Sequence, residues 1–201
     1  MSILDQSLDV LKDHLERKIS ITPAEFDYLT SLLKAKSLKK DECLIRPGEV
    51  CKYESFVTKG CLKSFYEDER GTVHIVDFCV EGWWADDLYS FFTQTPSRST
   101  IMAIEPCEVF QISFKDLEML YEKVPKFERF FRLLFQRAYI AQREQINMML
   151  SATAEERYRI FLQKKPYAEE RFSQQDIASY LGITPQFLSA MKKKLRTVKV
   201  D

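Results

Sequence analysis

The stretch QDIASYLGITPQFLSAMKKKL, residues 175–195, predicts two short helices joined by a tight turn. Ser173 can cap the N-terminus of the first helix, with Asp176 in the capping-box position, and Gly182 can take the left-handed conformation that ends it. Thr184 and Pro185 then begin the second helix as N-cap and first residue. Apolar residues predict the inward face of each helix: Ile177, Ala178, Leu181, Leu188, Met191 and Leu195. An ordinary helical hairpin would share this layout, but the glycine turn and the basic second helix favour a DNA-binding helix-turn-helix.

The charge distribution points the same way. The chain has 30 basic and 30 acidic residues, yet residues 151–201 hold ten Lys or Arg against six Asp or Glu. Five basic residues and no acidic one lie between Lys192 and Lys199. This surplus indicates a polyanionic partner, although a basic run can also be a solvated face.

The segments before this motif predict an α+β protein. Leucines at helical spacing in residues 4–15, then Thr22, Pro23 and Glu25 as a capping box, predict two N-terminal helices. Residues 38–113 hold short runs rich in β-branched and aromatic residues, interrupted by one short helix at GWWADDLYSFF (82–92). Glycines recur between the runs at intervals of 11–12 residues, which predicts a jelly roll. These glycines are Gly48, Gly60, Gly71 and Gly82.

A long helix is predicted for residues 125–150, which contain no Gly and no Pro after Pro125. Its apolar positions alternate steps of four and three, as in a coiled-coil seam, so we expect it to pair with a second copy of the chain. A helix packed into the chain's own core is the alternative. The seam residues are Phe127, Phe131, Leu134, Ala138 and Ala141. The expected organisation is a sensor domain at 1–124, a dimerisation helix at 125–150 and a DNA-binding domain at 151–201.

Composition excludes several other classes. No apolar run of about 18 residues predicts a membrane span, and the charged start MSILDQSLDVLKDHLERK has no signal-peptide core, so we expect a cytoplasmic protein. Five cysteines without a C-x-x-C argue against a disulfide framework or zinc ribbon. Two distant histidines, His14 and His74, and the lack of a nucleophile–base motif argue against a cupin-like enzyme, the rival from another class. We expect no enzyme activity, no metal and no cofactor.

The order of parts resembles the CRP/FNR family of bacterial transcription regulators. The resemblance rests on IRPGEV (45–50), VTKGCLKSFYEDERGTVHIVDF (57–78), EGWW (81–84), SRST (97–100) and the motif at 175–195, and it covers nearly the whole chain. It implies a homodimer that reads palindromic double-stranded DNA. RNA polymerase and an unknown small-molecule effector are the other expected partners. An iron–sulfur sensor of this family would need an N-terminal cysteine cluster, which residues 1–42 lack, and His74 alone offers a haem ligand in the sensor segment.

The second helix of the motif should read the DNA. Gln186 and Ser189 are expected to face base edges, and the lysines to touch phosphates. Ala190 stands where the family usually has an arginine, and only RTVKVD follows the helix, so the family's β-hairpin wing is expected to be short or missing. A module that binds another partner and not DNA is therefore a further alternative. The candidate DNA-binding residues are Ser173, Gln174, Thr184, Pro185, Gln186, Ser189, Ala190, Lys192, Lys193 and Lys194.

The effector site departs from the members that bind cyclic nucleotides. Those members have a Gly-Glu pair at the start of the roll's short helix and an Arg-Ser pair after it. Here Asp86 and Asp87 replace Gly-Glu, while Arg98 and Ser99 are kept. An aspartate at a helix N-terminus occupies the N–H donors and repels a phosphate, so we expect an N-cap, paired with Arg98, and no cyclic AMP binding. A shifted pocket in which Asp87 still holds a ribose hydroxyl, in a cyclic-AMP-responsive regulator, is the alternative. Gln142 and Arg143 complete the candidate effector set.

Overall fold

The computed structural model describes residues 3–197, and the chain divides into two compact units. The first combines Met1–Tyr66 with Asp77–Gln136, and the second combines Glu67–Val76 with Arg137–Asp201. The division falls inside the long helix, α5 (Lys126–Ser151), and not at its ends as the expected domain boundaries have it.

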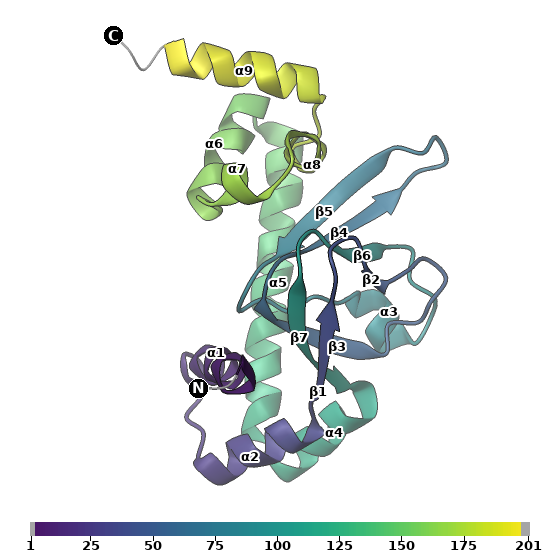
Figure 1. The fold of residues 1–201 in the computed structure, drawn as a ribbon, viewed down its shortest axis with the longest axis vertical. Helices are drawn as coiled ribbons and strands as arrows, with labels where there is room; N and C mark the ends of the chain where they lie inside the picture. Colours follow the sequence, from purple (N-terminus) through teal and green to yellow (C-terminus); the bar gives the residue numbers. More distant parts are fainter. Residues whose placement is uncertain (1–2, 198–201) are drawn as a thin grey trace. The chain divides into compact units, whose positions relative to one another are not determined.

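Two antiparallel sheets form the β-roll (Figure 1). In one, the strand order is β1-β7-β3, and Phe56 of β3 lies opposite Phe110 of β7. In the other, the order is β2-β6-β4-β5. The strands are β1 (Lys34–Leu38), β2 (Cys43–Ile45), β3 (Tyr53–Lys59), β4 (Leu62–Glu67), β5 (Val73–Cys79), β6 (Thr100–Ala103) and β7 (Cys107–Ser113). The predicted jelly roll is confirmed, although the sequence patterns did not reveal β1 or β6.

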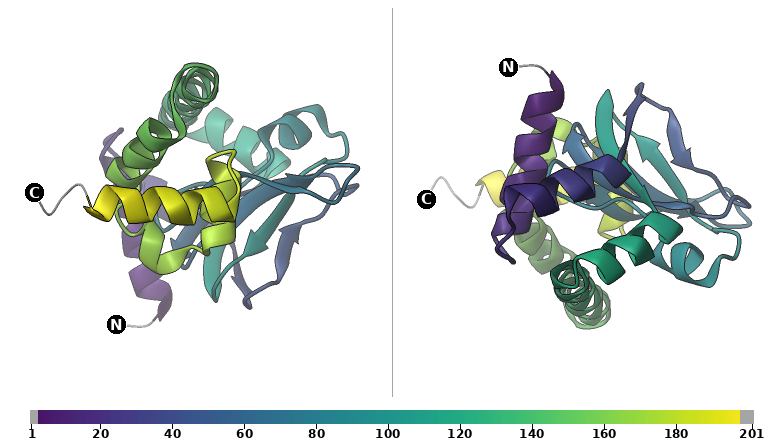
Figure 2. Two further views of the ribbon diagram at one scale, coloured as in Figure 1. Left: turned by 90° about the horizontal axis from the view of Figure 1, so that it is seen from above. Right: turned by 90° about the horizontal axis from the view of Figure 1, so that it is seen from below.

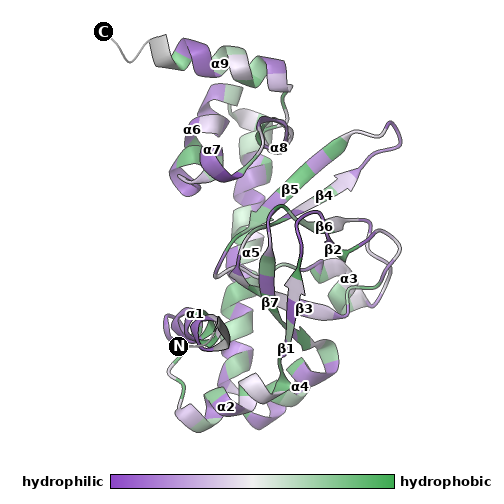
Figure 3. Cartoon of the chain, viewed as in Figure 1, coloured by the Kyte–Doolittle hydropathy of each residue, from purple (hydrophilic) through white to green (hydrophobic). Residues whose placement is uncertain are grey.

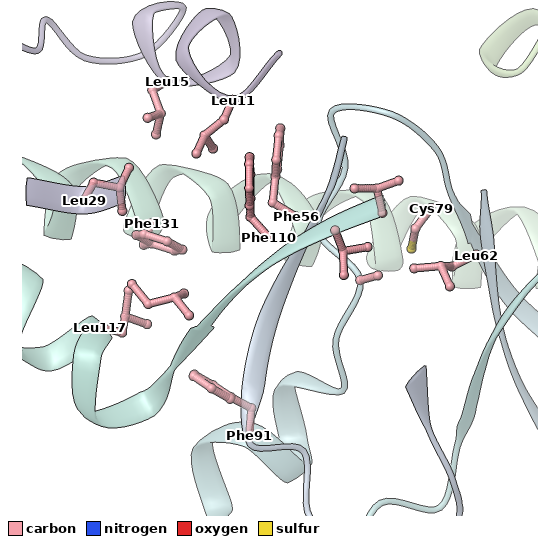
Figure 4. Close-up of a cluster of buried hydrophobic side chains, with 14 of the residues drawn as sticks. Leu11, Leu15, Leu29, Phe56, Leu62, Cys79, Phe91, Phe110, Leu117 and Phe131 are labelled. Atoms are coloured by element: carbon pink, nitrogen blue, oxygen red, sulfur yellow. The ribbon is translucent and has the colours of Figure 1, made fainter. Parts of the chain in front are cut away.

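The core of the first unit lies between the roll and its helices. Figure 4 shows side chains from both sheets and from the helices converging there, and the labelled ones include Leu11, Leu15, Leu29, Phe56, Phe110, Leu117 and Phe131. The helices that contribute are α1 (Ile3–Glu16), α2 (Pro23–Leu32), α4 (Phe114–Lys123) and the first turns of α5. The predicted capping box of α2 is present, because Thr22 N–H donates to Glu25 Oε2 at 2.8 Å and Glu25 N–H to Thr22 Oγ1 at 3.4 Å. All five cysteines are thiols outside any disulfide, as predicted, and all except Cys43 are buried.

The short helix of the roll, α3 (Leu88–Thr93), is shorter than the predicted 82–92. Residues 83–85 are extended and pair with β3: Val57 N–H donates to Trp83 O at 2.8 Å and Ala85 N–H to Ser55 O at 2.7 Å. These bonds between distant residues keep the segment out of the helix until Asp87 caps it. In the second view of Figure 2, seen from below, α1, α2 and α4 lie at the near end of the first unit.

The second unit is helical apart from residues 67–76, which hold the end of β4, the turn after it and the start of β5. It holds the C-terminal part of α5 with α6 (Ala154–Lys164), α7 (Ala168–Arg171), α8 (Gln174–Tyr180) and α9 (Pro185–Thr197). The predicted capping box of α6 forms between Thr153 and Glu156. Arg157 of α6 joins two helix ends, because Nε donates to Leu181 O at 3.1 Å and Nη1 donates to Ala152 O at 2.7 Å.

Replacing Arg157 with methionine should destabilise the second unit. The change leaves two helix-terminal carbonyls without their charged donor, which costs about 1–3 kcal/mol. The measurement is urea unfolding, with Arg159→Met as the control, because Arg159 pairs with Glu155 on its own helix and is largely exposed. Equal midpoints for the two variants would contradict this role for Arg157.

Candidate nucleic-acid interface and effector site

Helix α8 begins and ends as its capping residues predict. Ser173 Oγ accepts from Asp176 N–H at 3.0 Å, which caps the N-terminus. At the other end Gly182 has φ of +67°, Gly182 N–H donates to Ser179 O and Ile183 N–H donates to Ala178 O, both at 3.0 Å. This is a Schellman motif, which stops the helix and turns the chain toward α9. The first half of the motif is therefore fixed by local chemistry.

Helix α9 starts at Pro185, where Thr184 Oγ1 accepts from Phe187 N–H at 3.2 Å. Leu188 and Met191 are buried, as are Ile177, Ala178 and Leu181 of the preceding helix and its cap, while Leu195 is half-buried. Apolar residues recur among polar ones along α9 (Figure 3). The buried apolar residues lie on one side of the helix, and the other side is exposed to solvent. The first view of Figure 2 shows α9 lying across the other helices of the second unit.

The exposed side of α9 forms one stripe at spacings of three and four residues. We call Gln186, Ser189, Ala190, Lys193 and Lys194 the exposed stripe, and all five are exposed. The capping residues Ser173, Gln174, Thr184 and Pro185 are exposed as well. Nine of the ten predicted DNA-binding residues thus lie at the surface of one unit.

Lys192 is placed differently from the other predicted residues. Its side chain is mostly buried and its ammonium pairs with the Glu169 carboxylate, which also accepts from Tyr158 Oη at 2.7 Å. Residues 192 and 193 are adjacent, so their side chains point about 100° apart around the helix. Lys192 is thereby held within the unit, and Lys193 and Lys194 are the lysines left on the stripe.

Two residues that sequence reasoning missed also belong to this unit's surface and packing. Phe187, beside Gln186 in the first turn of α9, is 53% exposed. Ser179 of α8 binds the β5 edge, because its Oγ donates to Val73 O at 2.6 Å and accepts from Ile75 N–H at 3.0 Å. Phe187 could have been singled out from the sequence, because it is an aromatic residue beside Gln186, which is predicted to contact a base. The Ser179 contact could not, because it joins residues more than a hundred positions apart.

At the effector site, Asp87 is the N-cap of α3. Its Oδ1 accepts from Ser90 N–H at 3.1 Å and its Oδ2 accepts from Ser97 Oγ at 2.7 Å. Ser97, which the sequence analysis did not single out, is buried and its Oγ also accepts from Ser99 N–H at 3.0 Å. Both carboxylate oxygens of Asp87 are therefore engaged within the roll.

Among the other effector candidates, Ser99 is linked to Asp87 through the Ser97 hydroxyl. Arg98 is exposed and, within the described residues, forms no ion pair with Asp86 or Asp87, so the expected pairing is absent. Asp86 instead lies near the fully buried Glu54 of β3, and burial raises the pKa of both carboxyl groups. Gln142 and Arg143 are exposed residues of the second unit's part of α5.

The predicted seam of α5 splits between core and surface. Phe127 and Phe131 are buried in the core of the first unit and Leu134 packs against that core, so these side chains are already covered by their own chain. Ala138 is half-buried and Ala141 exposed. A second repeat lies one residue further on, at Tyr139, Gln142, Ile146 and Met149, and all four of these residues are exposed.

Comparison with known proteins shows which regulators the chain resembles. Residues 35–124 match the model of the cyclic nucleotide-binding domain. An anaerobic regulatory protein of Haemophilus influenzae is 26% identical over 195 residues, which cover 90% of this chain and 74% of the relative. The transcriptional activator protein anr of Pseudomonas aeruginosa is 27% identical over 183 residues, covering 85% and 74%.

The chain resembles the CRP/FNR family of regulators. The two relatives are a regulatory protein and a transcriptional activator, in line with the predicted regulator. Among solved structures, FixK2 from Bradyrhizobium japonicum has a TM-score of 0.72 at 21% identity and covers 83% of this chain and 86% of its own. That likeness confirms the CRP/FNR fold of roll, long helix and C-terminal helices. Within residues 3–197, no helix is long and apolar enough to cross a membrane.

Proposed function

We propose that this CRP/FNR regulator is a cytoplasmic homodimer that reads two-fold symmetric DNA with α9. The observation that carries the proposal is the exposed stripe, which presents an amide, a hydroxyl, a methyl group and two ammonium groups on one side of a helix whose other side is buried. Polar groups at the start of such a helix suit base edges in the major groove, and lysines further along suit phosphates.

A DNA shift assay on the purified chain tests this proposal. Binding should weaken steeply as salt rises, because each phosphate neutralised by a lysine releases condensed counterions. Binding that is absent at low salt would favour the rival, a module of the same fold that recognises a different partner. The prediction that the wing is short or missing concerns the residues after α9, and residues 198–201 lie outside the described part of the chain.

Replacing Gln186 with alanine should relax the choice of one base pair. A glutamine amide can bond adenine bidentately, and such a contact is worth about 1–3 kcal/mol of discrimination. The measurement is selection from a randomised site library. Lys194→Ala is the matched control, since loss of a phosphate contact should weaken all sequences alike and lower the salt slope by about one. An unchanged preference for every base pair in the Gln186→Ala variant would mean that Gln186 does not select a base.

Cyclic AMP should bind no tighter than about millimolar, which corresponds to about −4 kcal/mol. Asp87 fills the donors at the start of α3 with its own carboxylate, and Asp86 adds a second acidic group beside it. Calorimetry with cyclic AMP and cyclic GMP is the measurement. A micromolar constant that Arg98→Ala abolishes would restore a phosphate site at Arg98 and Ser99.

Dimerisation is proposed to use the repeat at Tyr139, Gln142, Ile146 and Met149, named here the exposed seam. It keeps the alternating steps of four and three that the sequence predicts, displaced by one residue from the predicted positions. A two-fold interface along α5 would present two copies of α9, as palindromic half-sites about one helical turn apart require.

A further inference from the structure

Phe187 lies in the first turn of α9, at the end of the helix that is proposed to enter the major groove. The hydrogen bond of the cap fixes its backbone, because Phe187 N–H donates to Thr184 Oγ1 at 3.2 Å. The next residue, Leu188, is fully buried, whereas the side chain of Phe187 is 53% exposed. An aromatic ring therefore lies at the surface of the reading helix, next to Gln186, which is predicted to contact a base.

Phe187 extends the exposed stripe along one edge. Residues three and four apart lie on the same side of a helix, so Phe187, Ala190 and Lys194 form a column, and all three are exposed. Ala190 is four residues after Gln186 and three after Phe187, so its methyl group lies between their positions around the helix. Phe187 and Ala190 together give the start of the stripe an apolar edge beside the polar group of Gln186.

The major groove of DNA offers one apolar group that suits this edge. Neither a phenyl ring nor a methyl group carries the donors and acceptors that most base edges require. Thymine presents its C5-methyl group in the major groove, and Phe and Ala are side chains that contact it. Charge complementarity favours DNA as the molecule that covers the edge, since residues 151–201 hold ten basic residues against six acidic ones.

We propose that Phe187, together with Ala190, selects a thymine in each half-site through the C5-methyl group of the base. The inference rests on the proposed function of α9 as the reading helix, and it adds a specificity-determining residue to Gln186. Gln186 selects adenine through hydrogen bonds, and Phe187 selects thymine by removing a methyl group from water. The short side chain of Ala190 leaves space for that methyl group beside the ring.

Replacing thymine with uracil in the bound site tests the proposal, because this change removes the methyl group and keeps the base pairing. The site is the one selected from the randomised library by the unmodified chain, and each of its thymines is replaced in turn in both half-sites. Burial of one methyl group is worth about fourfold in affinity, so loss of the contacted pair should weaken binding by about 15-fold. If no uracil substitution weakens binding, the proposal is wrong.

The Phe187→Ala variant shows whether the lost affinity belongs to this ring. It should bind the thymine site and the uracil site equally, because the side chain that distinguishes them has been removed. Phe187 is largely exposed and alanine favours a helix, so the variant should fold like the parent, which thermal unfolding checks. A Phe187→Ala variant that still prefers thymine places the methyl contact on another residue and overturns the assignment.

Lys194→Ala is the matched control, because Lys194 is exposed in the same column of α9. Loss of a phosphate contact should weaken binding to the thymine and uracil sites alike and leave the preference for thymine unchanged. A preference that disappears in this control as well would mean that Phe187 is not its source, which also overturns the assignment.

The assay separates this proposal from the proposed function on which it rests. If the unmodified chain binds DNA, and binding weakens with salt but not with uracil, only the role of Phe187 is wrong. If the unmodified chain binds no DNA at low salt, the proposed function is wrong, and the role of Phe187 is overturned with it.

Discussion

An Ile146→Asp variant should be a monomer of 23.7 kDa, while the unmodified chain has twice that mass. Ile146 is 50% exposed on the exposed seam, and a carboxylate there would be buried against its own copy in a two-fold interface. A monomer engages one half-site only, and the loss of the linked second head should weaken binding to a palindromic site by about 10²–10⁴-fold. Light scattering measures the mass and a shift assay measures the affinity.

Ile140→Asp is the matched control for this prediction. Ile140 is on the same helix, carries the same side chain and is 56% exposed, but it lies outside the exposed seam. The control variant should stay dimeric and bind DNA normally. If both variants dimerise, α5 is not the interface; if both are monomeric, the interface covers a wider face of α5 than the exposed seam.

The choice between the two stripes of α5 shows the limit of the sequence pattern. Phe127, Phe131 and Leu134 give the same alternation of four and three as Tyr139, Gln142 and Ile146, and the two sets differ by one residue, about 100° around the helix. The periodicity of the apolar residues shows that one side of the helix must pack against something. Whether the chain's own roll or another molecule covers it depends on tertiary packing, which the spacing does not contain.

Elements fixed by neighbouring residues could be predicted, and elements fixed by distant ones could not. The caps at Thr22, Thr153, Ser173 and Gly182 are local hydrogen-bond chemistry and were predicted with their partners. By contrast, α3 was predicted too long because residues 83–85 bond to β3. Lys192 was predicted to face phosphate because the sequence does not reveal its pairing with Glu169, which lies 23 positions away. Glu54 went unnoticed because its burial comes from packing on both faces of β3.

Glu54 should contribute to the pH dependence of stability. A carboxyl group whose folded pKa is raised stabilises the fold fully below its ordinary pKa of 4.5, and this contribution is lost as pH rises toward the folded value. Glu54→Gln cannot ionise at this position, so the variant should gain stability relative to the parent as pH rises above about 5. The gain reports the cost of ionising a buried carboxyl group beside Asp86.

Glu25 is the control of opposite sign for the Glu54 experiment. Its pKa is lowered to about 2, first by the hydrogen bond from Lys126 and then by the backbone N–H of Thr22, so its contribution is present above pH 4.5 and is lost as pH falls toward 2. Glu25→Gln should therefore lose stability at neutral pH and converge with the parent in acid, whereas Glu54→Gln should diverge from it in base. Urea unfolding across the pH range compares the three proteins. Parallel curves for the parent and Glu54→Gln would mean that neither burial nor the neighbouring Asp86 carboxyl group raises the pKa of Glu54 in solution.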